Sequence, residues 1–498
     1  MGKLRQKVAK DSFWNILTII LGKAGALIFT IFLARFLLPE GFGNYTLATS
    51  VALLFITFAD LGINQTMMRY VSSEFKKNKQ KATAYFSYIL KLKLILVGIS
   101  SLLLLILAYP ISIIFFKNNS LLIPIILSSL YVFFLAFIGF FESLFFIMNK
   151  VRYLAVKELV FQAIRIILVL IVFYFLASSY FVSGSILVLI ISNLLALSFL
   201  VYFSYKNLPY LFEKTKTKIN KNRILKFLFY IIILNISAVF FSYIDIIMIG
   251  FFLSPEYVGY YRAAFVLILG LLGLLGLSNI FLPVLSRINE DQVSNVFNSI
   301  LKYSMILAVP ATVGMLFLSS YVLKFVYGNS YLLATLPLFF LSPLIIIITI
   351  AGDLQTLFSA REKPRALAKL MIFITIINII LNLVLITALL KYSPIWAITG
   401  AAIATLLSWT IYLLWALILA RKQLSYSLDW KSLIKPAFAS AIMGLGLFAF
   451  KFFVKDMTLI LGILEVIFGT IIYLFALFLI NGTNKKDLIL FLGIFKKS

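Results

Sequence analysis

The chain has 498 residues, of which 63% are hydrophobic and only 12% are charged, and its net charge is +27. Soluble domains are about 45–50% apolar and about 25% charged, so this balance excludes a soluble globular protein. The chain holds no cysteine and no histidine, which removes disulfides, thiol chemistry and the commonest metal ligand.

Unbroken apolar runs follow one another along the chain. A membrane-spanning helix needs roughly 20 apolar residues, and about fourteen segments reach that length. Barrel strands would alternate apolar and polar residues, which these runs do not. We therefore predict an all-α polytopic membrane protein with about 14 transmembrane helices. The basic N-terminus lacks a small-residue cleavage pattern, so the first span is predicted to be retained.

Most of the 44 Lys and Arg residues fall in the N-terminus, the even-numbered loops and the C-terminus. The positive-inside rule then predicts a multi-pass protein of the cell membrane with both termini in the cytoplasm. Topology and attraction to anionic membrane lipids explain the net positive charge. No aromatic-basic groove or soluble domain points to nucleic acid as a partner.

One short sequence occurs twice. Residues 36–48 read FLLPEGFGNYTLA and residues 252–264 read FLSPEYVGYYRAA, with Pro, Glu, Gly and Tyr at the same spacing. A weaker match pairs residues 149–155 with residues 362–368 at nearly the same offset. Such self-similarity in a membrane chain indicates a transporter built from repeats. We expect Pro and Gly to form an external turn, and the glutamate to cap the helix that follows.

A basic segment at residues 206–223 separates the two copies. We predict a six-helix lobe at 1–205, this segment as a cytoplasmic linker, a second six-helix lobe at 224–423, and two additional helices with a cytoplasmic tail at 424–498. An even number of helices in each half makes the repeats parallel, so substrate is expected to bind between the halves.

Charged side chains within the apolar runs are costly and usually face a cavity or a partner. Cations outnumber acids there, which suits an anionic ligand such as a lipid phosphate. The candidates for substrate binding are Lys23, Arg165, Arg35, Arg262 and Lys91. Snorkelling toward the membrane surface is the alternative for those near helix ends.

Position along the helix separates these cations. Lys23 and Arg165 lie near the middle of their spans, which favours a cavity role over a purely structural pairing. Lys91 and Lys93 are two positions apart and point about 200° from each other on a helix, so only one can face a given cavity.

Two polar stripes occupy corresponding helices of the halves. Glu158, Gln162 and Arg165 share one helix face, and Thr375, Asn378 and Asn382 form the matching stripe. Paired stripes favour a cavity between the halves. An internal salt bridge in the first stripe, or hydrogen bonds between helices in both, are the alternatives.

The acids of the spans are candidates for ion coupling. Asp60 lies inside a span with Asn64 one turn away, and together they could carry a proton or hold Na⁺. Asp60 could equally pair with a cation or cap a helix break at Gly62. Asp245 and Asp353 lie nearer opposite ends of their spans. We predict no bound metal and no cofactor beyond such H⁺ or Na⁺ coupling.

Further motifs extend the duplication. LAR, LPEGFGNY and ADLG occur in order between residues 33 and 62, and YIDIIMIG, SPEYVGYYRAA and LPVLSR lie in the second half. Together they resemble the polysaccharide-exporter flippases, the O-antigen-translocase-like branch of the multidrug/oligosaccharidyl-lipid/polysaccharide exporter superfamily. The resemblance implies a two-lobed transporter that moves a lipid-linked oligosaccharide on polyprenyl phosphate or pyrophosphate, with the last two helices as a groove for the tail.

We therefore expect a flippase that works by alternating access and holds an anionic headgroup in a cationic central cavity. A cation-coupled drug or metabolite antiporter of the same superfamily is the alternative, although it needs acids more than cations. A membrane polysaccharide polymerase is less favoured, because no loop is large enough for a catalytic region. The chain has no phosphate-binding P-loop, and we predict no catalytic residues and no enzymatic activity.

Overall fold

The computed structural model describes residues 2–275, 285, 290–424, 426, 431–453 and 459–482, and these form helices and connecting turns with no strand among them. The prediction of an all-α protein is confirmed. The chain divides into two compact units, an N-terminal unit of Met1–Gly259 and a C-terminal unit of Tyr260–Ser498. The predicted limits of lobes, linker and additional helices remain predictions. The LPVLSR motif lies outside the described residues except for Leu285.

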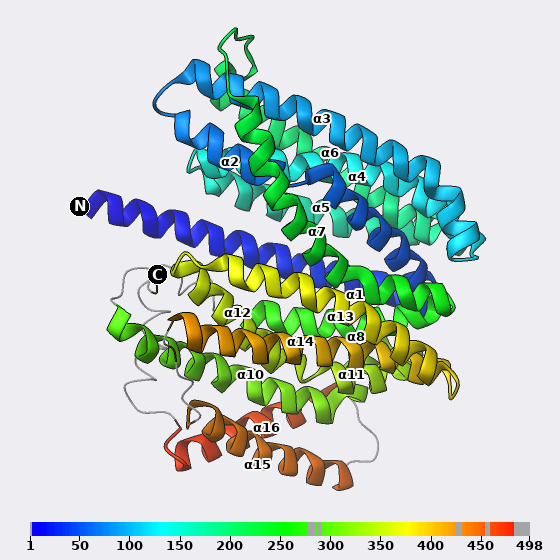
Figure 1. Ribbon diagram of the computed structural model, residues 1–498. Coiled ribbons are helices and arrows are strands. Elements are labelled where there is room, and N and C mark those ends of the chain that lie inside the picture. Colours follow the sequence, from blue (N-terminus) through cyan, green and yellow to red (C-terminus); the bar gives the residue numbers. More distant parts are fainter. Residues whose placement is uncertain are drawn as a thin grey trace. The chain divides into compact units, whose positions relative to one another are not determined.

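The N-terminal unit is a helical bundle (Figure 1). Its α-helices are α1 Gly2–Asp60, α2 Ile63–Glu74, α3 Lys79–Tyr109, α4 Leu122–Ile147, α5 Val151–Phe175, α6 Phe181–Asn207 and α7 Lys221–Phe252, followed by the start of α8 Pro255–Leu275. A π-helical turn at Pro110–Phe115 and 3₁₀ turns at Asn119–Leu121, Ser178–Tyr180 and Pro209–Phe212 connect them. The packing of α1 on α5, of α4 on α6 and of α3 on α4 builds the interior.

Helix α1 is interrupted where the sequence predicts a turn. Leu38 has φ 56° and ψ 175°, directly before Pro39. Proline has no N–H to continue the helical hydrogen bonds and disfavours helical geometry at the residue before it, so the helix kinks here. The predicted turn is therefore a sharp kink between two helical segments. Glu256 occupies the first turn of α8, as expected for an acid near a helix N-terminus.

The two copies of the repeated sequence pack against each other within the N-terminal unit. A methyl group added at Gly43 would lie 1.7 Å from the carbonyl oxygen of Pro255. Reciprocally, a methyl group at Gly259 would lie 2.0 Å from the carbonyl oxygen of Pro39. Only glycine allows backbones to approach this closely. The duplicated Pro-Glu-x-x-Gly pattern is therefore required by a reciprocal backbone contact.

The C-terminal unit contains the rest of α8 and helices α10 to α16. Their limits are α10 Glu290–Tyr327, α11 Thr335–Leu341, α12 Leu344–Ala360, α13 Pro364–Leu390, α14 Pro394–Leu424, α15 Lys431–Phe453 and α16 Leu459–Leu479, with a 3₁₀ segment at Asn329–Ala334. Helices α13 and α14 pack along their lengths. The last two helices, α15 and α16, dock on α10, where the Tyr473 hydroxyl donates to the carbonyl of Ile306 at 2.8 Å.

Ten stretches of the described helices are long and apolar enough to cross a membrane, and an eleventh results if the bent pair Asn329–Leu341 and Leu344–Ala360 is one span. At 1.5 Å per residue, the 59 residues of α1 are long enough for more than one crossing of a hydrocarbon core of about 30 Å. The chain is a multi-pass membrane protein. The predicted count of about 14 remains a prediction.

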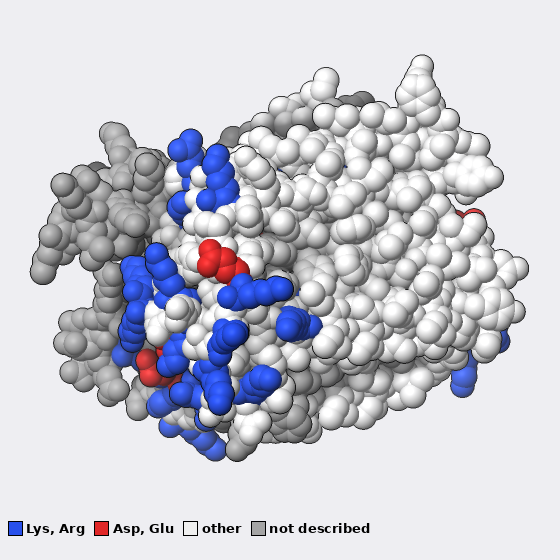
Figure 2. Space-filling model, turned by 90° about the horizontal axis from the view of Figure 1, so that it is seen from above, with Lys and Arg blue, Asp and Glu red and all other residues white. Residues whose placement is uncertain are grey.

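Charge is distributed unevenly over the surface. Lys and Arg gather at one end of the face drawn in Figure 2, and the rest of that face carries few charges. The turn between α2 and α3 has exposed Lys76, Lys77 and Lys79, and the 206–223 segment lies beside it, because Thr83 donates to the Tyr210 carbonyl at 3.0 Å. The arrangement is that of a protein whose apolar surface lies in lipid and whose basic ends lie at headgroups.

Candidate functional site

The N-terminal unit contains an open cavity of about 360 Å³ whose wall includes a cluster of charged and polar side chains. Helices α1 to α6 all contribute to its wall. Its polar lining consists of three carboxylates, two lysines and two amides: Asp60, Glu142, Glu158, Lys93, Lys157, Asn64 and Asn193. Its apolar lining includes Ile56, Leu135 and Phe161. We call this space the N-terminal cavity.

A helix break opens the backbone beside the N-terminal cavity. Helix α1 ends at Asp60 and α2 begins at Ile63, with Leu61 at φ 41° and Gly62 at φ 82°. Positive φ costs an L-residue energy, so Leu61 is held there by its surroundings. A break at Gly62 is one of the alternatives predicted from the sequence, and it directs the side chains of Asp60 and Asn64 to one cavity. Broken helices of this kind form the binding sites of many transporters.

Asp60 is paired with a lysine. The Lys93 Nζ donates to Asp60 Oδ1 at 2.7 Å, and the Lys93 side chain is 0% exposed whereas that of Asp60 is 21% exposed. Pairing with a cation is one of the two readings that the sequence allows for Asp60. The end of α1 also carries a partial negative charge, which stabilises the ammonium further.

A second ionic cluster lies on α4 and α5. The buried Lys157 Nζ donates to Glu142 Oε1 at 2.8 Å and to Glu158 Oε2 at 2.6 Å. One ammonium thus bridges two carboxylates from adjacent helices. An ammonium has three donors, so Lys157 can serve both and keep one for another partner.

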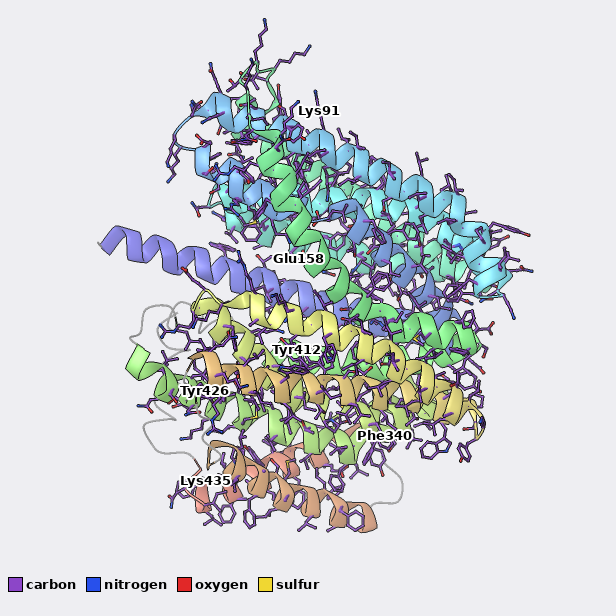
Figure 3. All side chains as sticks on the ribbon, viewed as in Figure 1. Lys91, Glu158, Phe340, Tyr412, Tyr426 and Lys435 are labelled. Atoms are coloured by element: carbon purple, nitrogen blue, oxygen red, sulfur yellow. The ribbon has the colours of Figure 1, made fainter. Side chains whose placement is uncertain are left out.

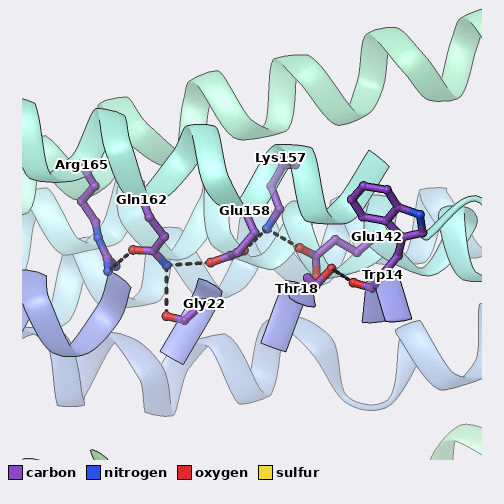
Figure 4. A network of polar contacts seen from close by, with 8 residues as sticks. All are labelled: Trp14, Thr18, Gly22, Glu142, Lys157, Glu158, Gln162 and Arg165. Atoms are coloured by element: carbon purple, nitrogen blue, oxygen red, sulfur yellow. Dashed lines mark hydrogen bonds and ion pairs between the residues drawn. The ribbon is translucent and has the colours of Figure 1, made fainter. Parts of the chain in front are cut away.

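The polar stripe of α5 continues from this cluster toward α1 (Figure 4). Gln162 Nε2 donates to Glu158 Oε1 at 2.6 Å and to the Gly22 carbonyl at 3.3 Å, and Arg165 Nη2 donates to Gln162 Oε1 at 2.5 Å. The Arg165 guanidinium also stacks 4.1 Å from the centre of the Phe29 ring. The stripe is therefore one hydrogen-bonded chain that begins at the cavity wall and runs along the α1 contact.

Two asparagines of the N-terminal cavity each have an amide oxygen that is unpaired among the described residues. Asn193 is 1% exposed and donates to the Leu189 carbonyl at 2.6 Å, yet its Oδ1 has no hydrogen-bond partner among the described residues. The Oδ1 of Asn64 is likewise buried without a partner in that part of the chain. Each of these oxygens has less than 1 Å² of accessible surface, so both lie behind the cavity surface and are not open to a ligand in this structure.

The formal charge of the N-terminal cavity is −1 when all five ionisable groups are charged, because three carboxylates face two ammoniums. The predicted cationic lining therefore does not describe this space. No group of three acids among the described residues lies close enough to hold a metal ion. Lysines pair with the carboxylates, so hydrogen-bond acceptors and donors alternate along the cavity wall.

The structure brings together some of the residues predicted for a site. Asp60 and Asn64 line the N-terminal cavity, and Arg165 joins it through Gln162 and Glu158. Lys23 and Arg35 are exposed on α1. Lys91 is exposed on the outer side of α3 (Figure 3), whereas Lys93 faces the cavity.

The remaining predicted residues lie on other helices. Asp245 is buried on α7, Asp353 is buried on α12, and Arg262 is half-buried on α8. In the second stripe, Asn378 Nδ2 donates to Ser408 Oγ on α14 at 3.3 Å, so this residue links two helices. The sequence reasoning missed Lys157, which lies so near the start of its span that it resembles an interfacial lysine.

Comparison with known proteins places this geometry in context. The chain matches the family described as polysaccharide biosynthesis protein over residues 8–289. It is 26% identical over 275 residues to the probable low-salt glycan biosynthesis flippase Agl15 of Haloferax volcanii, covering 54% of each chain. It is 29% identical over 185 residues to the probable flippase AglR of the same organism, covering 36% of this chain and 37% of that one. The chain thus spans about half the length of Agl15, which it matches over more residues than AglR.

Solved structures show the same fold. The lipid II flippase MurJ in an inward closed conformation aligns with a TM-score of 0.72 and 17% identity, covering 94% of this chain and 98% of that one. An inward-facing multidrug resistance MATE family transporter of the MOP superfamily aligns with a TM-score of 0.60 and 15% identity, covering 83% and 94%.

Proposed function

Because the chain belongs to the polysaccharide biosynthesis protein family, we propose that it is a flippase that moves a lipid-linked glycan from the cytoplasmic to the outer leaflet of the cell membrane. The expected polysaccharide-exporter relationship is confirmed by the family match. The similarity to proteins called probable flippases of glycan biosynthesis supports the activity. The multi-pass fold agrees with transport across a membrane.

The N-terminal cavity is the observation that carries this proposal. Ionisable groups inside a membrane bundle are expensive and mark substrate or ion pathways. Five such groups and two amides line one space here, among helices apolar enough to span the bilayer. A glycan headgroup needs a hydrated, hydrogen-bonding route, whereas its lipid tail can stay in the hydrocarbon.

The mechanism we propose is alternating access. The headgroup enters from the cytoplasm, the protein changes conformation, and the headgroup leaves on the outer side. The broken α1–α2 junction supports this proposal, because discontinuous helices occur where transporters bind and move substrate. Both termini are cytoplasmic in this proposal, in agreement with the basic character of the α2–α3 turn and of residues 206–223.

We propose that the polyprenyl phosphate or pyrophosphate of the substrate meets cations outside the N-terminal cavity. Arg165 is the first candidate, because its Nε is buried without a hydrogen-bond partner among the described residues, and guanidinium binds phosphate through several donors. Lys23, Arg35 and Arg262 remain candidates. Lys91 is a weaker one, since its exposed position on α3 also suits snorkelling.

A second function, cation-coupled export of a drug or metabolite, is favoured by one observation. The N-terminal cavity has more carboxylates than lysines, and the sequence argument against an antiporter was its apparent excess of cations. Coupling of glycan transport to H⁺ or Na⁺ through Asp60 and Asn64, or through Asp245 or Asp353, belongs to the same proposal.

Depletion of this protein in cells tests the proposal. The readout is the amount of lipid-linked glycan and its exposure on the outer leaflet of spheroplasts. A flippase requires glycan to accumulate on the cytoplasmic leaflet, and re-expression must restore its exposure. Normal exposure together with increased drug sensitivity would replace the flippase by the antiporter. Exposed but unpolymerised glycan would indicate a polymerase.

A further inference from the structure

We infer that the N-terminal cavity binds sugar rings of the translocated glycan and selects sugars that carry no negative charge. This inference rests on the proposed flippase function and adds a substrate class to it. It also differs from the expectation of a cationic site for an anionic headgroup, because the lining holds three carboxylates.

The size of the N-terminal cavity suits a small part of a glycan. A water occupies about 30 Å³ in the liquid, so about 360 Å³ has room for about twelve waters, or roughly one or two sugar rings. Small-molecule sites start at about 300 Å³, which places this cavity at the lower limit. The Phe161 ring in the wall offers an apolar surface for the C–H face of a ring.

The hydrogen-bonding groups match hydroxyls. Asp60 keeps acceptor capacity after pairing with Lys93, and Glu142 keeps acceptor capacity after pairing with Lys157. The ammoniums of Lys93 and Lys157 keep donors, because each has three. A hydroxyl both donates and accepts, so a polyol can serve both kinds of group at once.

Other ligands fit less well. A carboxylate or sulfate on the sugar would enter a space of net charge −1 and would be repelled by its carboxylates. A multivalent metal ion finds no cluster of three acids among the described residues. An amino sugar remains compatible, since its ammonium donates to carboxylates. The selection is therefore against acidic sugars.

The experiment uses the full-length protein in proteoliposomes with two probes on the same short prenyl pyrophosphate. One probe carries a glucose disaccharide, and in the other the terminal glucose is a glucuronic acid. The wild-type protein should move the neutral probe at least about tenfold faster, since a site built for hydrogen bonding rejects a mismatched group strongly.

Two variants probe the lining. Glu142→Gln removes one negative charge at nearly constant size, and should lower the neutral-to-acidic rate ratio several-fold. Asn193→Leu replaces a polar side chain of the cavity lining by an apolar one, and should slow the neutral probe about tenfold, the effect of losing about 1.4 kcal/mol of binding. Ser304→Ala is the control, because Ser304 on α10 in the other unit is equally buried, its hydroxyl has no hydrogen-bond partner among the described residues, and it belongs to no proposed site. Its rates and ratio should equal those of the wild type.

Equal wild-type rates for the two probes would overturn the inference and leave the flippase function standing. An unchanged ratio in Glu142→Gln, with the neutral probe still transported, would do the same. Transport of neither probe by the wild type would overturn the flippase function and this inference together. The wild-type ratio needs no variant, so the test holds even if Asn193→Leu fails to fold.

Discussion

The ion pair between Lys93 and Asp60 should stabilise the N-terminal unit measurably. Lys93→Met leaves the Asp60 carboxylate without its partner at 2.7 Å. Breaking a buried pair by removing one partner costs about 3–5 kcal/mol. Because the Asp60 side chain keeps 21% exposure and lines a polar cavity, we expect the lower end, about 3 kcal/mol.

A double-mutant cycle separates the pair from its surroundings. Asp60→Asn alone leaves a buried ammonium and should cost a similar amount, whereas the double variant should lose only about 1 kcal/mol, since replacing a whole buried pair is often nearly neutral. These losses correspond to a coupling energy of about 5 kcal/mol, which exceeds the usual range of about 0.5–3 kcal/mol for contacting residues because each single variant leaves a buried charge unpaired. The free energy of unfolding would be measured by SDS titration in mixed micelles.

Lys91 provides the control on the same helix. It lies two residues away and is exposed, so Lys91→Met should change the free energy of unfolding by no more than about 0.5 kcal/mol. Equal losses in Lys91→Met and Lys93→Met would refute the assignment of Lys93 to the cavity. Additive losses in the cycle would show that Lys93 and Asp60 do not interact.

Three further predictions concern packing, charge and topology. Gly43→Ala should destabilise the protein by about 1–3 kcal/mol in the same titration, because the added methyl group meets a backbone carbonyl. Gly98→Ala is the control: Gly98 has open space around it, so this change should be neutral or stabilising. Lys157→Met should cost at least about 3 kcal/mol and lower transport, since it leaves two neighbouring glutamates uncompensated; unchanged stability would exclude the bridging role. Because the chain has no cysteine, Thr215→Cys and Lys391→Cys each give a single reactive thiol. An impermeant maleimide should react with the thiol at position 391 in intact cells and with the thiol at position 215 only after permeabilisation. The reverse pattern would show that the topology is inverted.

The helical fold and its duplication could be predicted because they are encoded locally. Apolar runs of span length identify membrane helices from composition alone. The repeated Pro-Glu-x-x-Gly pattern identifies the duplication, and the structure supplies its reason in the contact of Gly43 with the carbonyl of Pro255. What the sequence leaves open is that the two copies touch each other, because that depends on packing between α1 and the start of α8.

The site could be predicted only in part, because its pairs join different helices. Helix geometry shows that Lys91 and Lys93 point apart, but which of them is buried depends on the neighbours of α3. From the sequence alone, Lys157 resembles a lysine at the membrane surface. In the structure its Nζ lies 2.8 Å from Glu142 Oε1 on the preceding helix. The excess of cations along the chain therefore does not extend to the N-terminal cavity, where carboxylates outnumber lysines.

The most direct test of a glycan path through the N-terminal cavity is protection of a cysteine within it. Ala196 is a small residue of the cavity wall on α6, and the chain has no other cysteine, so Ala196→Cys gives a single reporter. Its rate of modification by a methanethiosulfonate reagent would be measured in proteoliposomes with and without a neutral lipid-linked disaccharide, with Ser178→Cys in the exposed turn between α5 and α6 as control. The account predicts that substrate slows modification at position 196 severalfold and leaves position 178 unchanged. Equal rates at position 196 while the same vesicles transport the substrate would contradict it.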